Sequence, residues 1–118
     1  LSQVVDTSDE WIASRTGIRQ RRVAAAQESL ATLATQAAAQ AIAMANLAPT
    51  EIDLILLATS TPDDLFGTAC RVQAGLGATH AVAFDLTAAC SGFVFGMVTA
   101  AQYIQTGTFR NVVLIGAD

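Results

Sequence analysis

The sequence predicts an α/β protein built on a predominantly parallel sheet. Three apolar runs, at residues 53–60, 80–86 and 111–117, alternate with two segments of helical character, at 68–77 and 91–106. This alternation is typical of parallel strands joined by right-handed crossovers. Of the 118 residues, 53% are hydrophobic and 14% are charged, which is enough apolar material for one core.

Two helices are predicted before the first strand. Thr7 and Glu10 are spaced as a capping box and Gly17 as a left-handed C-cap, so a short helix is expected between them. Residues 18–24 lack helical periodicity and are expected to be extended or to form a loop. Ser29 is expected to begin the second helix, because apolar residues then recur at spacings of three and four. The recurring positions are Leu30, Leu33, Ala34, Ala37, Ala41 and Ala45.

The first strand and the helix after it have clear boundaries. A turn is expected at Pro49, and residues 53–60 are apolar on both faces, as expected for a buried parallel strand. Residues 61–67 are expected to form a loop. Gly77 is expected to end the helix predicted at 68–77.

The helix predicted at 91–106 carries no charge and is apolar on nearly every face. One stripe consists of Phe93, Met97, Ala100, Ala101 and Ile104, while Val94, Phe95 and Val98 cover other faces. A helix of this kind is expected to be buried on both sides. This requires more layers than 118 residues supply, so we expect the chain, which begins at Leu1 and ends at Asp118, to be part of a longer protein.

Charge limits the classes of partner. The net charge is −4 and no lysine occurs, which argues against a general nucleic-acid binder. Arg15, Arg19, Arg21 and Arg22 nevertheless lie close together in the sequence. They could meet a phosphorylated ligand or an acidic partner, or form a solvated turn, and charge alone leaves these readings open.

Cysteine content and hydropathy indicate the compartment. Two cysteines without a secretory leader favour a reducing compartment, so a cytoplasmic location is expected. The charge-free windows 29–50 and 86–109 are interrupted by polar residues, so no membrane span is expected.

Cys90 is the main candidate for a catalytic residue. It lies between the strand predicted at 80–86 and the helix predicted at 91–106, at the edge where α/β sheets bind ligands. Free N–H groups at a helix start favour a thiolate, which makes Cys90 a plausible nucleophile for acyl transfer. Ala88, Ala89, Ser91 and Gly92 leave room for a substrate carbonyl. The alternative is that Cys90 only fills a gap under the sheet.

The remaining cysteine and the single histidine are weaker candidates. Cys70 lies within an ordinary helix and is expected to be a packing residue. His80 is expected at the opposite end of the strand that leads to Cys90, about 20 Å away at roughly 3.3 Å per residue. His80 is therefore not expected to be the base for Cys90, and this sequence supplies no other histidine.

Two motifs resemble a known family. The segments TSDEWIASRTGIRQRR and FDLTAACSGF resemble the β-ketoacyl-[acyl-carrier-protein] synthases of type III, in the thiolase-like superfamily. The resemblance implies a thiolase-like αβαβα fold, of which residues 1–118 are the amino-terminal part and the second half is absent. It also implies that Cys90 accepts an acyl group from acyl-CoA, with acetyl-CoA expected. The acyl group then condenses with malonyl-acyl-carrier protein to start fatty acid synthesis.

The resemblance also assigns roles to other residues. Trp11 would stack on the adenine of CoA, Arg15 would contact its phosphates, and Thr7 would lie near the base. Phe66 would reach the acyl pocket of the partner in a homodimer, and the Cys90 N–H would be an oxyanion donor. Acyl-CoA is implied as a substrate, with no permanently bound cofactor and no metal.

The family's catalytic histidine and asparagine belong to the second half, so residues 1–118 alone are expected to be inactive. Two alternatives remain open. One is another thiolase-like cysteine enzyme, of the polyketide starter or hydroxymethylglutaryl-CoA synthase type. The other is a non-catalytic thioester-binding or dimerisation module.

Overall fold

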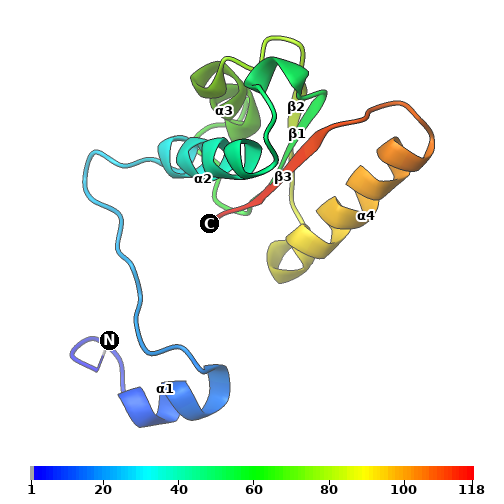
Figure 1. The fold of residues 1–118 in the computed structure, drawn as a ribbon. Helices are drawn as coiled ribbons and strands as arrows, with labels where there is room; N and C mark the ends of the chain where they lie inside the picture. Colours follow the sequence, from blue (N-terminus) through cyan, green and yellow to red (C-terminus); the bar gives the residue numbers. More distant parts are fainter. Residues whose placement is uncertain (1) are drawn as a thin grey trace.

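Three parallel strands form the centre of the molecule. The computed structural model describes residues 2–118, with β1 (Leu54–Ala58), β2 (Val82–Leu86) and β3 (Val112–Gly116) in the order β2-β1-β3 (Figure 1). Both pairings are parallel, and Leu54 lies opposite Val82 and Val112. The predicted parallel α/β sheet is confirmed, and all three strands lie within the predicted ranges.

Helices cover both faces of this sheet. Figure 1 shows α2 (Leu30–Met44) and α3 (Thr68–Leu76) on one side and α4 (Gly92–Gln105) on the other. Alternate strand residues face opposite sides, so Ile55 and Leu57 pack with α2 and α3, whereas Leu56 faces α4. Every residue of β1 is buried because the strand is central and covered on both faces.

Most helix ends lie where the local sequence predicted them. Gly17 and Gly77 adopt left-handed conformations after α1 (Asp9–Thr16) and α3, as predicted. Ser29 is the N-cap of α2, also as predicted. The predicted capping box of Thr7 and Glu10 is wrong by one residue, because the Ser8 side chain accepts the capping hydrogen bond from the Trp11 N–H. A 3-10 turn, η1 (Pro49–Glu51), occupies the expected turn before β1.

The buried face of α2 differs from the predicted stripe. The buried residues are Ala31, Ala34, Ala38 and Ile42, and only Ala34 belongs to the predicted set. Leu33 is 38% exposed, although its spacing suggested burial. In a helix this rich in alanine the apolar pattern spreads over several faces, so packing against the sheet and α3 selects which one is buried.

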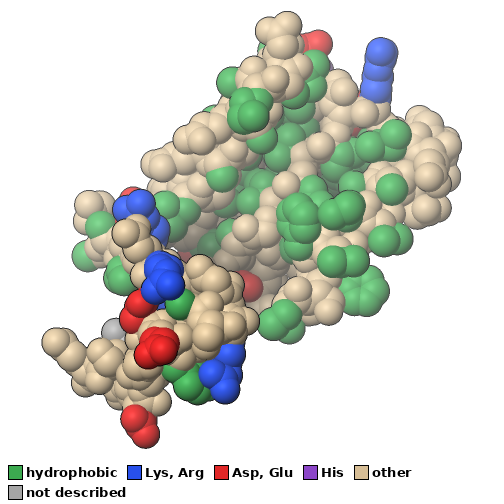
Figure 2. Space-filling view, turned by 60° about the horizontal axis from the view of Figure 1, so that its bottom comes forward, with side chains coloured by type: hydrophobic (Ala, Val, Ile, Leu, Met, Phe, Trp, Pro, Cys, Tyr) green, Lys and Arg blue, Asp and Glu red, His purple; other side chains and the backbone are tan. Residues whose placement is uncertain are grey.

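The apolar stripe of α4 that was identified in the sequence is only partly buried. Gly92, Gly96 and Ala100 are its buried residues, while the large side chains of the helix, such as Phe93 and Met97, are about half exposed. Hydrophobic side chains gather on the right of Figure 2, where α4 comes forward. Small residues thus let α4 approach the sheet. Phe93 also packs beside Gly116 of β3, where an added Cβ would lie 3.0 Å from the Phe93 Cδ2. The prediction that a further layer covers the exposed side chains of α4 stays a prediction.

The amino-terminal region extends away from the sheet. Figure 1 shows α1 apart from the strands, joined to α2 by residues 17–28, which form neither helix nor strand. The expectation of extended or loop structure at 18–24 is confirmed. Among the described residues 2–118, no helix is long and apolar enough to cross a membrane.

Candidate active site

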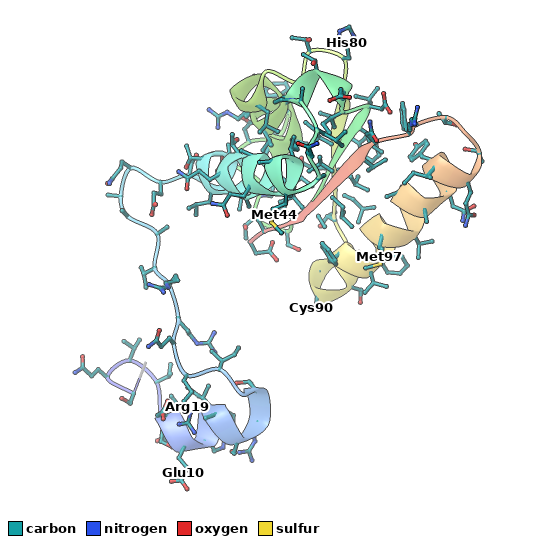
Figure 3. The ribbon with its side chains drawn as sticks, viewed as in Figure 1. Glu10, Arg19, Met44, His80, Cys90 and Met97 are labelled. Carbon is teal, nitrogen blue, oxygen red and sulfur yellow. The ribbon has the colours of Figure 1, made fainter. Side chains whose placement is uncertain are left out.

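Cys90 lies at the carboxyl edge of the sheet. It follows β2 and belongs to a short 3-10 turn, η2 (Ala89–Ser91), after which α4 begins at Gly92. Cys90 is exposed, and Figure 3 shows it at the beginning of α4. The structure therefore places the cysteine at the predicted junction of strand and helix. The reading of Cys90 as a buried gap filler is wrong in this structure, because the residue is exposed.

The turn that carries Cys90 is tight. Ala89 has a φ of 46°, in the left-handed region that residues other than glycine rarely adopt. Such a conformation costs about 1–2 kcal/mol and is often found at functional sites. A Cβ added to Gly92 would lie 3.4 Å from the Ala58 Cβ, so the start of α4 packs directly on β1. Of the small residues around Cys90, Gly92 therefore has a packing role.

Neither Cys70 nor His80 lies at this site. Cys70 belongs to α3, where its Sγ donates to the Ala83 carbonyl at 3.6 Å. It is exposed, so the expectation that it fills a gap in the core is wrong. His80 is exposed and lies at the opposite end of β2 from Cys90, as predicted (Figure 3).

Trp11 and Arg15 form a stacked pair on α1. Their spacing of four residues brings them to one face of the helix, and the guanidinium carbon lies 4.2 Å from the centroid of the indole ring. Trp11 is 53% exposed, which is unusual for a tryptophan and leaves the ring accessible. The pair thus presents an aromatic surface and a positive charge side by side.

Thr7 and three arginines line a hollow beside α1. The hollow has a volume of about 490 Å³, and Thr7, Arg19, Arg21 and Arg22 are among its lining residues. Arg19 also pairs with Asp9 at 2.9 Å between Nη1 and Oδ2. Thr7 Oγ1 is buried and, among the described residues, has no hydrogen-bond partner. Most of the predicted arginine cluster is therefore gathered at one hollow, which Thr7 shares.

The structure does not bring these α1 residues to Cys90. Glu10 and Arg19, which mark α1 and the segment after it, lie well apart from Cys90 in Figure 3. In residues 2–118, no group of three or more histidine, cysteine, aspartate or glutamate side chains is placed to hold a metal ion.

Phe66 lies at the tip of the loop between β1 and α3. Leu65 is 100% exposed and Phe66 is 92% exposed, so two large apolar side chains project into solvent. The tip is ordered internally, because the Phe66 N–H donates to Asp64 Oδ1 at 2.9 Å. An exposed apolar pair on a hydrogen-bonded loop is typical of an interaction surface.

Two carboxylates that hold this loop were missed by sequence reasoning. Asp85 of β2 accepts hydrogen bonds from the Thr68 and Ala69 N–H groups at the start of α3. Asp63 of the loop accepts hydrogen bonds from the Leu30 and Ala31 N–H groups at the start of α2. An acidic residue in an otherwise apolar strand was the available signal for Asp85, because a half-buried carboxylate needs partners.

The sequence is similar to known proteins of one family. A family model described as 3-oxoacyl-[acyl-carrier-protein (ACP)] synthase III matches residues 84–118, which include Cys90. The β-ketoacyl-[acyl-carrier-protein] synthase III of Acaryochloris marina is 70% identical over all 118 residues of the chain, which cover 36% of that protein. The chain thus spans about a third of the length of such curated relatives.

Two solved structures resemble the fold. The 3-oxoacyl-[acyl-carrier-protein] synthase III of Aquifex aeolicus matches with a TM-score of 0.89 and 52% identity, over 98% of this chain and 38% of that one. The priming β-ketosynthase of a polyketide biosynthetic pathway matches with a TM-score of 0.85 and 36% identity, over 94% of this chain and 34% of that one. The predicted thiolase-like fold class is confirmed. Over its whole length, the chain is therefore similar in sequence and in fold to about a third of the length of β-ketoacyl-[acyl-carrier-protein] synthases of type III.

Proposed function

We propose that residues 1–118 are the amino-terminal part of an acyltransferase that starts fatty acid synthesis. The full-length protein condenses an acyl-CoA, with acetyl-CoA expected, with malonyl-acyl-carrier protein in the cytoplasm. The observation that carries this proposal is the exposed Cys90 in the tight turn between β2 and α4, within the segment that matches the family model.

The chemistry is a thioester exchange followed by a carbon–carbon bond formation. The Cys90 thiolate attacks the acyl-CoA carbonyl, the CoA thiolate leaves, and an acyl-cysteine remains. Malonyl-acyl-carrier protein then loses CO₂, and its carbanion attacks the acyl-cysteine carbonyl. The β-ketoacyl product departs on the carrier protein, and the Cys90 thiolate is regenerated. The Cys90 N–H is one oxyanion donor at both attacks.

The histidine and asparagine needed for decarboxylation come from the second half of the protein. The only histidine of this chain is His80, which lies at the wrong end of β2. Residues 1–118 alone are therefore inactive in condensation.

The CoA end of the substrate binds at α1. The Trp11 ring stacks on the adenine, Arg15 contacts the phosphates, and Thr7 lies near the base. Because Arg15 already covers one face of the indole ring, the adenine takes the other face or displaces the guanidinium towards the phosphates. The unpaired hydroxyl of Thr7 supports a ligand at this end.

Phe66 contributes to a site in a second copy of the protein. Its almost complete exposure supports insertion into the acyl pocket of the partner in a homodimer. Burial of Leu65 and Phe66 in such an interface would remove two large apolar side chains from water.

The test compares two cysteine variants of the full-length protein. With acetyl-CoA and malonyl-acyl-carrier protein, the wild type and Cys70→Ala should release CO₂ and form the β-ketoacyl product, whereas Cys90→Ala should not. Cys70→Ala is a matched control because Cys70 is also exposed. Product formation by Cys90→Ala, or none by the wild type, contradicts the proposal.

Alkylation separates an enzyme from a binding module. Iodoacetamide should label Cys90 faster than Cys70 if the turn before α4 favours the thiolate. Both cysteines are exposed, so access alone does not explain a difference in labelling rate. Equally slow labelling of both would favour a non-catalytic module.

A second candidate function is priming of polyketide synthesis. The similarity to a polyketide priming β-ketosynthase, with 36% identity, favours it as the alternative. Assays with acyl carrier proteins from both types of pathway distinguish the two, since a polyketide enzyme should prefer the carrier protein of its own pathway.

A further inference from the structure

Asp85 caps a helix that cannot cap itself. The N-cap residue of α3 is Gly67, which has no side chain to accept a hydrogen bond and a φ of 96° that favours glycine. Asp85 supplies the missing acceptor from the neighbouring strand. Its Oδ2 accepts from the Thr68 N–H at 2.8 Å and its Oδ1 from the Ala69 N–H at 2.7 Å. Both carboxylate oxygens are thus used, and the negative charge lies at the positive end of the α3 dipole.

Gly67 also permits close approach of the loop to this carboxylate. A Cβ at Gly67 would lie 3.6 Å from the Asp85 Cγ, so the backbone at Gly67 lies over the carboxyl group. Thr68 is fully buried, and its Oγ1 accepts a hydrogen bond from the Asp63 N–H at 2.8 Å. Thr68 therefore links Asp85 to the loop, because its N–H donates to Asp85 and its hydroxyl accepts from Asp63.

The other end of the loop is held in the same way. The Asp63 carboxylate accepts from the N–H groups of Leu30 and Ala31, at 3.2 Å and 3.0 Å. Hydrogen bonds thus hold residues 63–68 to α2 at one end and to β2 at the other. Leu65 and Phe66 project from the stretch between these two anchors.

Asp85 and Cys90 belong to one continuous segment, since β2 ends at Leu86 and the turn with Cys90 follows. We infer that Asp85 is a positioning residue, which sets the position of Phe66 relative to β2, the strand that leads to Cys90. The inference rests on the proposed function, in which Phe66 of one subunit shapes the acyl pocket of the other. Loss of the Asp85 cap then changes the acyl-chain selectivity of the enzyme.

The first test measures the loop without any turnover. In Asp85→Asn, one carboxylate oxygen is replaced by an NH₂ group that faces a backbone N–H. Amide hydrogen exchange at residues 61–69 of the full-length protein should become faster by about fivefold or more, the factor expected for loss of a helix cap. Asp53→Asn is the matched control, because Asp53 also accepts two backbone N–H bonds, from Arg110 and Asn111, but lies before β1 at the other end of the sheet.

The second test measures selectivity. Asp85→Asn should change the ratio of kcat/KM for butyryl-CoA and acetyl-CoA by about tenfold, as displacement of a positioning group by about 1 Å can do. Asp53→Asn should leave this ratio unchanged. In a Phe66→Ala background, Asp85→Asn should produce no further change, because the residue that it positions is gone.

The outcomes separate the two ideas. Unchanged exchange at 61–69, or an unchanged selectivity ratio in an active Asp85→Asn enzyme, overturns the positioning role. A wild type without condensing activity contradicts the proposed function, and exchange at 61–69 then decides by itself whether Asp85 holds the loop.

Discussion

Gly96 of α4 lies directly against Leu114 of β3. A Cβ at Gly96 would stand 2.6 Å from the Leu114 Cδ1, which is closer than real Cβ contacts allow, and 3.6 Å from the Leu56 Cδ2. The contact brings α4 onto the sheet at the position where the helix has no side chain. It sets the distance between the sheet and the helix that follows Cys90.

Gly96→Val should therefore destabilise the protein by about 1–3 kcal/mol, because the added methyl groups overpack this contact. Chemical denaturation measures the change. In a Leu114→Ala background, which makes room for the valine, the loss should shrink by about 1 kcal/mol or more, since the two residues are in contact. Equal losses in both backgrounds would show that the close approach does not limit packing.

The left-handed conformation of Ala89 makes the Cys90 turn sensitive to substitution. Ala89→Val should disrupt the turn, because a β-branched residue is poorly tolerated at a φ of 46°. We expect iodoacetamide labelling of Cys90 in the full-length protein to change with this variant, while labelling of Cys70 stays the same. Ala89→Gly is the control, because glycine adopts this φ freely and should leave the labelling of Cys90 close to that of the wild type. An unaltered Cys90 rate in Ala89→Val would argue against strain as a feature of the site.

The exposed indole ring of Trp11 should contribute to CoA affinity in the full-length enzyme. Stacking of a base on an aromatic side chain is worth about 1–3 kcal/mol, so Trp11→Ala should raise the KM for acetyl-CoA by about tenfold. The kcat should change little, since this contact is remote from the reacting carbonyl. Trp11→Phe, which keeps an aromatic face, should lie between the two. Steady-state kinetics with an unaffected KM would remove Trp11 from the CoA site.

Asp53 should make stability depend on pH in the acid range. Hydrogen bonds from two backbone N–H groups stabilise the carboxylate and lower the pKa of Asp53 below its usual value. The bond from Asn111 has the larger effect, and the bond from Arg110 follows. Because the pKa is lower in the folded state, the stabilisation is present above the unfolded pKa of about 3.9 and is lost as pH falls through the folded pKa.

Urea unfolding of the wild type and of Asp53→Asn tests this dependence. The wild type should be the more stable protein at pH 6, and the difference should narrow progressively below about pH 4. A difference that stays constant down to pH 2 would mean that the charge on Asp53 contributes nothing to stability.

The elements of this fold follow from local sequence. The run at 53–60 is apolar on both faces, and the chain buries it as the central strand β1. Gly17, Gly77 and Gly107 all adopt positive φ at the ends of predicted helices, because each helix end requires a left-handed residue that glycine supplies without strain. Ser8, and not Thr7, is the N-cap of α1. The two hydroxyl residues are adjacent in the sequence, so spacing alone does not distinguish them.

The location of Cys90 could also be predicted, since a strand followed by a helix in a parallel sheet places the connecting residue at the carboxyl edge. The supporting carboxylates could not. Asp85 reaches Thr68 and Asp63 reaches Leu30, partners that are 17 and 33 residues away. A local sequence pattern cannot predict pairs that are so far apart in the chain. Only the folded structure shows that these carboxylates cap helices.

The sequence by itself determined which segments become strands and helices and where Cys90 lies, because these depend on residue type and short spacing. The tertiary structure decided which face of α2 and of α4 meets the sheet, since a helix that is apolar on many faces has no preferred side until it packs. It also decided the anchoring of the Phe66 loop, because hydrogen bonds between distant segments form only once the backbone has brought their donors and acceptors together.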